Sequence, residues 1–379
     1  MSAPVRLMAV GGFATGAGMR LLDPLLPLVA AGFATSVSSA AILIAAFMLP
    51  YGAGQLLTGP LGDRLGKLRV ASVALGLYGI VTAAAVFAST LGEMTTLRVL
   101  AGALGGAVIP LMIAHVGDKV PYEERQAALG RFATGMVMAQ LVAGPLSGVI
   151  GEHFGWRASF LVLGLFACGV GAFLFHRIGR GDRGTSTGKG LGLSGYATLL
   201  RRPAGRSLML LAFFDGFFLF GGAFPFVGSL VIERFGLSAG EAGLLVALFG
   251  LGAFTYTRIA KQLVRRFGEA GLMRWGGGSL AVLLLLTAAS PDWHLTALAQ
   301  AFAGLAFYMF HGVLQARATE ALPEARGTAV SAFALALFLG QTAGALVFAL
   351  ILAAAGYAWV FGLAAAGMAA LTVWAARRR

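Results

Sequence analysis

The stretch Gly-Pro-Leu-Gly-Asp-Arg-Leu-Gly-Lys-Leu-Arg, residues 59–69, decides how the rest of the chain is interpreted. It is a short charged segment between two long apolar runs, 38–58 and 70–89, so it must turn the chain between two helices. Its glycines permit close approach and unusual backbone dihedrals. Basic residues in so short a turn indicate the cytoplasmic side of a membrane. The stretch therefore predicts a helical membrane protein with this turn on the cytoplasmic face.

The composition also places the chain in a membrane. Its 379 residues have a mean hydropathy of +0.85, and only 11% are charged, whereas a soluble domain has about 25%. The 56 glycines are typical of helices that pack closely in lipid. The net charge of +13 could indicate nucleic acid, but in so apolar a chain we assign the basic residues to membrane topology and expect no nucleic-acid partner. The single cysteine, Cys168, predicts neither an intramolecular disulfide nor a metal site.

Twelve segments are long and apolar enough to span a membrane, which takes about 20 residues. They are 7–31, 38–58, 70–89, 94–115, 127–150, 157–176, 207–232, 241–260, 271–290, 294–316, 327–352 and 355–376. The first could instead be a cleaved signal peptide. It contains Arg20 and Asp23, however, and it is longer than the apolar core of about 7–15 residues found in signal peptides. We therefore expect an all-α integral membrane protein with twelve transmembrane helices.

The basic residues predict the orientation and the domain organisation. If the N-terminus is cytoplasmic, nearly all Lys and Arg residues lie on the cytoplasmic side, and the C-terminus lies there too. The Gly/Ser/Thr-rich basic segment 177–206 then forms a cytoplasmic linker between six-helix halves at 1–176 and 207–379. These halves look like repeats, because three pairs of residues recur at one constant offset: Phe33 with Phe235, Gly66 with Gly268, and Pro121 with Pro323.

The opening stretch resembles the G-x-L-a-D-R-x-G-R-K loop of the major facilitator superfamily, between that family's second and third helices. The matching residues are Gly59, Leu61, Asp63, Arg64, Gly66 and Lys67. Arg98 and Gly102 resemble the family's R-x-x-q-G motif in the fourth helix, with Ala101 in place of the usual Gln. The resemblance implies alternating access to a substrate site between two parallel repeats, near the bilayer midplane.

Two further elements resemble proton-driven antiporters of that family. Gly144, Pro145 and Gly148 resemble the G-P-x-x-G-G element, with Val149 at the position of its last glycine. The same residues could equally form a packing kink. Residues 20–27 resemble the first helix of bacterial drug:proton efflux permeases. These motifs specify the superfamily far better than the substrate.

Three ionisable residues are expected to lie together within the membrane. Asp23 and Arg98 reach about the same depth in the outer half, and Arg20 shares a helical face with Asp23. A charge inside a membrane helix costs about 2.5–3.5 kcal/mol at the centre, so retaining it needs a reason. Two reasons remain open: a proton or anion site, or a clamp that locks the first and fourth helices together.

Asp215 is the second candidate for proton coupling. It lies between phenylalanine pairs, roughly 12 Å from the inner side, and has no basic neighbour in its own helix. Burial without a partner favours the protonated carboxyl, although a permanently neutral acid could also serve as a hydrogen-bonding group. His311 and Gln315, one turn apart in the tenth helix, could line the same cavity or simply pack.

Asp63, Arg64 and Asp118 are expected to act in gating. In the family, the acid of the loop meets the start of the eleventh helix, where the helix dipole is positive, and its Arg pairs with an acid at the end of the fourth helix. The partners here would be the backbone near Gly327 for Asp63 and the Asp118 carboxylate for Arg64. A simple solvated surface is the alternative for Asp118.

The sequence thus predicts a secondary transporter rather than an enzyme, because it shows no catalytic set, phosphate loop or metal cluster. We expect a monomer in the inner or plasma membrane that exports small organic molecules in exchange for protons and needs no cofactor. A proton-coupled uptake symporter for sugars or organic anions is the main alternative. A membrane sensor that transports nothing is a further one.

Overall fold

The computed structural model describes residues 2–184, 192–322 and 326–377, and within these ranges every element is a helix. The first group of elements is α1 (Ser2–Arg20), α2 (Leu26–Gly32), α3 (Val37–Ala40), α4 (Ile42–Leu65), α5 (Lys67–Ala84), η1 (Ala85–Phe87), α6 (Leu91–Lys119), α7 (Tyr122–Phe154), α8 (Trp156–Arg177) and η2 (Gly179–Gly181). The second group is α9 (Gly192–Arg201), α10 (Pro203–Asp215), the π-helix η3 (Gly216–Ala223), η4 (Phe224–Phe226), α11 (Val227–Phe235), α12 (Ala239–Ala288), α13 (Trp293–Glu320), α14 (Arg326–Ala355) and α15 (Tyr357–Arg377). Among the described residues, ten helices are long and apolar enough to cross a membrane.

The segment expected as a first span, 7–31, is interrupted. Helix α1 ends at Arg20, and α2 begins at Leu26. Between them the chain turns tightly: the Asp23 amide donates to the Arg20 carbonyl at 3.1 Å, and the Leu25 amide donates to the Leu22 carbonyl at 3.0 Å. Pro24 has no amide hydrogen to continue the α-helical pattern. The break leaves two helical pieces in place of one long helix.

The spans expected at 241–260 and 271–290 are two helical arms separated by a kink, and the label α12 covers both. They meet at Gly268, which has a non-helical φ of +62°. Gly66 has a φ of +98° and joins α4 directly to α5. Glycine adopts positive φ without steric cost, so both turns need one residue each. Gly66 and Gly268 are also paired in the expected repeat, whereas Pro323 lies outside the described residues.

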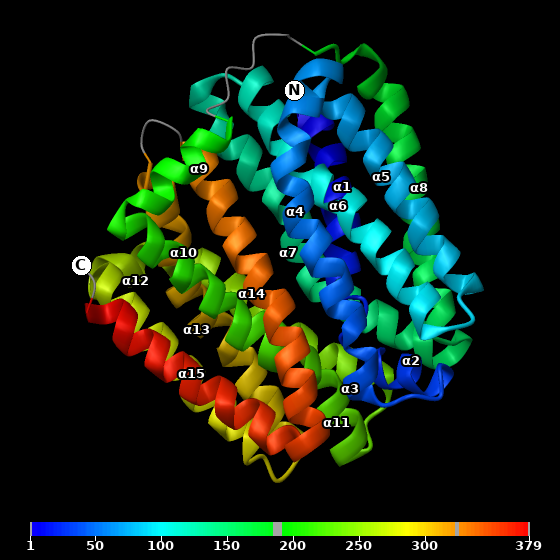
Figure 1. Cartoon of the computed structure of the whole chain (residues 1–379), viewed down its shortest axis with the longest axis vertical. Coiled ribbons are helices and arrows are strands. Elements are labelled where there is room, and N and C mark those ends of the chain that lie inside the picture. The colour runs from blue at the N-terminus through cyan, green and yellow to red at the C-terminus, as the bar shows by residue number, and fades with distance from the viewer. Residues whose placement is uncertain (1, 185–191, 323–325, 378–379) are drawn as a thin grey trace.

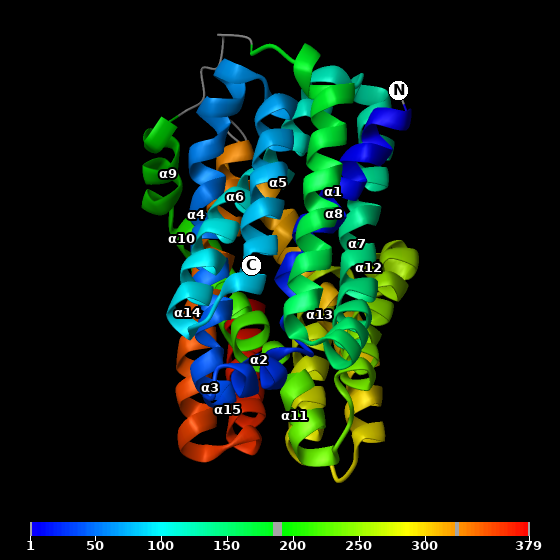
Figure 2. The same cartoon turned by 90° about the vertical axis from the view of Figure 1, so that its right-hand side faces the viewer.

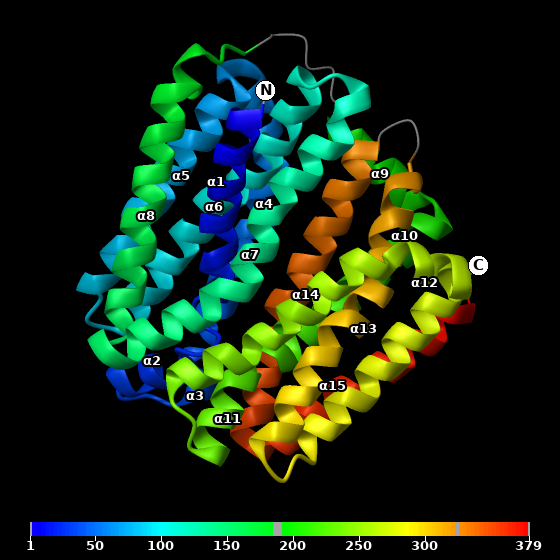
Figure 3. The ribbon, with the colours of Figure 1, turned by 180° about the vertical axis from the view of Figure 1, so that it is seen from behind.

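The helices form two bundles that lie side by side (Figure 1). The first contains α1 and α4–α8, and the second contains α10–α15. Between the bundles, α7 packs against α12, as Figure 3 shows from behind, while α4 packs against α14 and α2 against α11.

The two ends of the molecule differ. We call the end that carries the N-terminus and the 63–69 turn the loop end, and the end that carries α2, α3 and α11 the far end (Figures 1 and 2). Residues 178–184, which follow α8, lie at the loop end beside the 63–69 turn.

Glycine explains how close the helices come. A Cβ on Gly106 of α6 would collide with the backbone carbonyl of Tyr51 in α4, and one on Gly171 of α8 would lie 2.5 Å from the backbone nitrogen of Gly76 in α5. Small residues at such crossings let helix backbones approach one another in lipid. The close helix packing predicted from the abundance of glycine is therefore present at these crossings.

Candidate functional site

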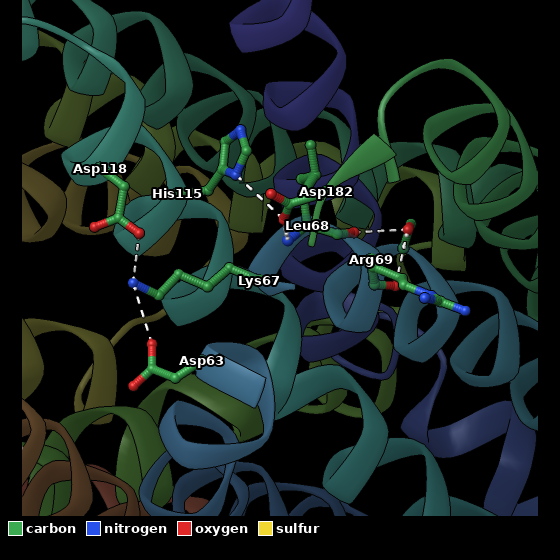
Figure 4. A network of polar contacts seen from close by, with 8 residues as sticks. Asp63, Lys67, Leu68, Arg69, His115, Asp118 and Asp182 are labelled. Atoms are coloured by element: carbon green, nitrogen blue, oxygen red, sulfur yellow. Dashed lines mark hydrogen bonds and ion pairs between the residues drawn. The ribbon is translucent and has the colours of Figure 1, made fainter. Parts of the chain in front are cut away.

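Lys67 is the centre of a charged network at the loop end (Figure 4). Its Nζ lies 2.5 Å from Asp118 Oδ2 and 3.3 Å from Asp63 Oδ1. One cation therefore bridges the end of α4 and the end of α6. The expected pairing of Asp118 with Arg64 is wrong in this structure: Arg64 is exposed, and the cation on Asp118 is Lys67. The reason is the turn at Gly66, whose φ of +98° ends α4 and starts α5 at Lys67, so that this side chain lies between the two carboxylates.

Asp182, which no sequence pattern singled out, completes this network (Figure 4). Its Oδ2 accepts a hydrogen bond of 2.7 Å from the Leu68 amide in the first turn of α5, and it lies 3.5 Å from Nδ1 of His115. A carboxylate there satisfies an otherwise free N–H and opposes the positive end of the helix dipole. The segment after α8 is thus fastened to the 63–69 turn. The side-chain surroundings of Gly327, the expected partner region of Asp63, lie outside the described residues.

Arg20 and Asp23 form a buried ion pair, with Nη1 and Oδ2 3.5 Å apart. Arg98 lies close enough for its charge to act on Asp23, but its hydrogen bonds go to backbone carbonyls. Nε donates to Leu43 at 3.2 Å, and Nη1 donates to Gly18 at 3.2 Å. Arg98 therefore ties α6 to both α4 and α1. The geometry is that of a clamp between α6 and its neighbours beside an ion pair within the first bundle. The proton or anion site stays a prediction.

Arg20 also reaches the second bundle. Its guanidinium carbon lies 4.6 Å from the ring centre of Phe220 and 4.8 Å from that of Phe224. A cation over an aromatic face is stabilised by the ring quadrupole. These rings belong to η3 and η4, the irregular segment between α10 and α11. Sequence reasoning missed this contact because no local pattern links Arg20 to rings so remote in the chain.

Asp215 has a partner from another helix. Its Oδ2 lies 2.6 Å from Nδ1 of His311 in α13, and its side chain is 0% exposed. Its Oδ1 is buried and has no hydrogen-bond partner among the described residues. The π-helix η3 begins at the next residue, Gly216, and such segments are frequent at functional sites. Gln315, one turn beyond His311, is exposed.

A continuous series of ring contacts joins the Asp215–His311 pair to the Arg20–Asp23 pair. The His311 ring stacks on Phe307, with centres 4.8 Å apart and an interplanar angle of 17°. Phe307 in turn lies 4.8 Å from Phe220, which is one of the two rings under Arg20. The two candidate acids, expected separately from the sequence, thus belong to one assembly that crosses between the bundles.

The Gly144–Gly148 element lies where α7 meets α12. A Cβ on Gly144 would lie 3.3 Å from the Gly243 carbonyl oxygen, and a Cβ on Gly148 would collide with the Ala239 carbonyl. Helix α7 continues through Pro145 without a break. The geometry of this element is that of close packing between the bundles.

Two bundles of long apolar helices, each with a buried pair of ionisable side chains, are typical of an integral membrane transporter. The family model for the Major Facilitator Superfamily matches residues 8–285 and 208–379. The chain belongs to this superfamily; it is a multi-pass membrane transporter and not an enzyme.

Its relatives carry several functions. An uncharacterised MFS-type transporter of Bacillus subtilis (strain 168), YwfA, is 26% identical over 96% of this chain and 89% of its own length. A chloramphenicol resistance protein of Pseudomonas aeruginosa is 26% identical over 78% of this chain and 70% of its own. A probable sugar efflux transporter of Pasteurella multocida (strain Pm70) is 28% identical over 60% of this chain and 55% of its own.

Solved structures share the fold. A D-xylose-proton symporter aligns over 98% of this chain and 95% of its own, with a TM-score of 0.77 and 19% identity. The nucleoside transporter NupG aligns over 100% of both chains, with a TM-score of 0.79 and 14% identity. At these identities the likeness concerns the fold alone.

Proposed function

We propose that the protein is a proton-coupled transporter that works by alternating access and exports small organic molecules in exchange for protons. The observation that carries the proton coupling is the buried Asp215–His311 pair. Support for export comes from relatives whose names state chloramphenicol resistance and sugar efflux, and from the resemblance of residues 20–27 and 144–148 to antiporters.

The pair has the chemistry that a reversible proton site needs. With Asp215 ionised, His311 can donate its Nδ1 hydrogen to Oδ2; with one further proton the pair becomes neutral overall. The buried Oδ1 of Asp215 has no partner among the described residues, so it is available for a hydrogen bond that forms in another state. A proton carrier must meet each side of the membrane in turn. We expect the relative movement of the bundles to expose this pair, which lies in the second bundle, to each side.

The ring series provides a route by which protonation could affect the substrate. Any shift of His311 is transmitted to Phe307 and Phe220, because their rings are in contact. Phe220 lies under Arg20, whose only charged partner among the described residues is Asp23. We place the substrate between the bundles beside these rings, with Arg20, Asp23, Arg98, Asp215, His311 and Gln315 as candidate cavity residues.

We further propose the topology that the sequence predicts. Counting the two arms of α12 separately, and α1 with α2 as one broken span, gives twelve membrane segments in the described residues. The halves are then 1–176 and 207–379, joined by the linker 177–206. The loop end, rich in basic residues, is cytoplasmic and carries both chain termini. Gly59, Asp63, Arg64, Gly66 and Asp118 form its gate together with Lys67, and the protein works as a monomer in the plasma membrane.

A decisive experiment uses the sign of the pH gradient. Purified protein in sealed liposomes is given chloramphenicol, a sugar or a nucleoside as probe, with the lumen made either acidic or alkaline relative to the outside. An antiporter accumulates substrate when the lumen is acidic, because protons leave as substrate enters. A symporter accumulates it when the lumen is alkaline. Both results hold whichever way the protein is inserted.

Uptake by symport is the second candidate. The observation that favours it concerns Arg20, whose cation contacts rings of the second bundle. Its Nε has no hydrogen-bond partner among the described residues, so it could bind an organic anion or a sugar hydroxyl. Accumulation driven only by an alkaline lumen would establish symport and exclude proton-driven export.

A further inference from the structure

At the far end, a carboxylate of one bundle binds the start of a helix in the other bundle. Glu152 lies in the last turn of α7. Its Oε2 accepts a hydrogen bond of 3.0 Å from the backbone N–H of Gly240, the second residue of α12. Ser238, which caps α12, also has its hydroxyl close to Gly240. The positive end of the α12 dipole therefore faces a negative charge from α7.

Helix α12 does not need Glu152 in order to begin. Ser238 and Glu241 already form a reciprocal cap: the Glu241 amide donates to Ser238 Oγ at 3.2 Å, and the Ser238 amide donates to Glu241 Oε2 at 2.8 Å. Such a capping box satisfies two of the free N–H groups by itself. Glu152 accepts a hydrogen bond from a third N–H of α12 but belongs to α7. Its distinctive effect is therefore to link the two bundles.

The helices are already in close contact behind this bond. Gly144 and Gly148 of α7 face Gly243 and Ala239 of α12 so closely that no side chain fits between their backbones. The Glu152 bond lies at the tip of this glycine seam. Bond and seam together join the two bundles at the far end, along α7 and α12.

The loop end is arranged differently. The acid there, Asp63, is held by Lys67 of its own bundle. Near the loop end of α7, Ala133 and Thr134 are exposed, and a Cβ on Gly130 would meet nothing within 4 Å among the described residues. Glu152 at the far end thus bonds to the other bundle, whereas Asp63 at the loop end pairs within its own bundle.

We propose that Glu152 is the latch of a far-end gate: its bond to the first turn of α12 stabilises the conformation closed at the far end, and it breaks when that end opens. This rests on the proposed alternating access. In each half of the cycle one acid of the first bundle, Glu152 or Asp63, binds the start of a helix in the second bundle. Glu152 is a gating residue and does not bind substrate.

The test measures the distance across the far end by electron–electron resonance between spin labels. Cys168 is first replaced by Ser, and labels are placed at Phe87 of η1 and Trp359 of α15, which are 83% and 59% exposed. The variants are Glu152→Gln, which keeps an acceptor but loses the charge, and Glu152→Ala, which loses both. Glu241→Gln is the matched control, because it perturbs the start of α12 without touching α7.

We expect Glu152→Gln to raise the ratio of long to short distances about two- to fivefold, the range of a charge at a helix terminus. Glu152→Ala should raise it at least as much and should speed hydrogen exchange at residues 239–242. Glu241→Gln should leave the distances unchanged. An unaltered distribution in Glu152→Ala, or an equal change in Glu241→Gln, overturns the latch. Neither measurement needs a substrate, so failure of the latch is distinct from failure of transport by the unmodified protein.

Discussion

At the scale of single residues, the Asp215–His311 pair carries the strongest consequences. Asp215→Asn keeps a hydrogen-bonding side chain beside His311 but cannot ionise. We expect gradient-driven accumulation to stop, while substrate binding and exchange between equal pH compartments survive. Both activities are measured in the same proteoliposomes, with and without a pH gradient. A mutant that still concentrates substrate would make Asp215 structural and move the coupling site to Asp23.

Asp23→Asn tests the second buried pair. Breaking a buried ion pair by removing one partner costs about 3–5 kcal/mol. The rings of Phe220 and Phe224 still contact the Arg20 guanidinium in the variant and offset part of this cost. We therefore expect a marked fall in melting temperature in detergent. The control is the double variant Arg20→Gln with Asp23→Asn, which should recover part of the loss because no charge is left unpaired. Equal stability of the single variant and the unmodified protein would contradict a structural ion pair.

At the scale of elements, Asp63 belongs to a network whose contacts are partly exposed. Asp63→Asn leaves Lys67 paired with Asp118, so we expect a stability change within about 1 kcal/mol, as for surface ion pairs. The transport rate should fall severalfold, because the variant lacks the charge that would face a helix N-terminus when the loop end closes. The measurement is the initial transport rate of the variant at saturating substrate. A rate equal to that of the unmodified protein would count against a gating role for Asp63.

Asp182 tests how the segment after α8 is fastened to α5. Asp182→Ala removes the acceptor of the Leu68 amide, so we expect a loss of about 1 kcal/mol, as for other N-terminal caps. Hydrogen exchange in the first turn of α5 should rise with it. Asp182→Asn is the control: it keeps the cap and loses only the charge facing His115, so exchange there should stay near that of the unmodified protein. Equal exchange in both variants would exclude a capping role.

At the scale of the whole molecule, we expect closure of the far end to require the close packing of Gly144 and Gly148 against α12. Gly148→Val would force α7 away from α12, because a Cβ there collides with the Ala239 carbonyl. We expect transport to stop while the protein still inserts into the membrane. Gly169→Val is the matched control, since a Cβ at Gly169 of α8 meets nothing within 4 Å among the described residues. If both variants transport normally, close packing of the seam is not needed for the cycle.

The class of molecule could be predicted from local features of the sequence. Long apolar runs, few charges and the 59–69 motif indicated a membrane transporter of the major facilitator superfamily, and the family match confirmed it. These features are local: hydropathy, turn glycines and charge each act within a few residues of the chain. The approximate helix positions followed for the same reason, except where Pro24 breaks the first span. The spans on either side of Gly268 are separated by a kink, as expected.

The pairing of the charged side chains, by contrast, depends on how the helices pack in three dimensions. Asp118 pairs with Lys67 instead of Arg64, and Asp182 binds the Leu68 amide beside it. Asp215 pairs with His311, which lies on a helix about a hundred residues away. Glu152 and Gly240, likewise remote in the chain, met between the bundles. Such pairings depend on the rotation and depth of each helix, and close glycine contacts at the crossings restrict both. The sequence carries that information only through packing of the entire molecule, so no local pattern could reveal it.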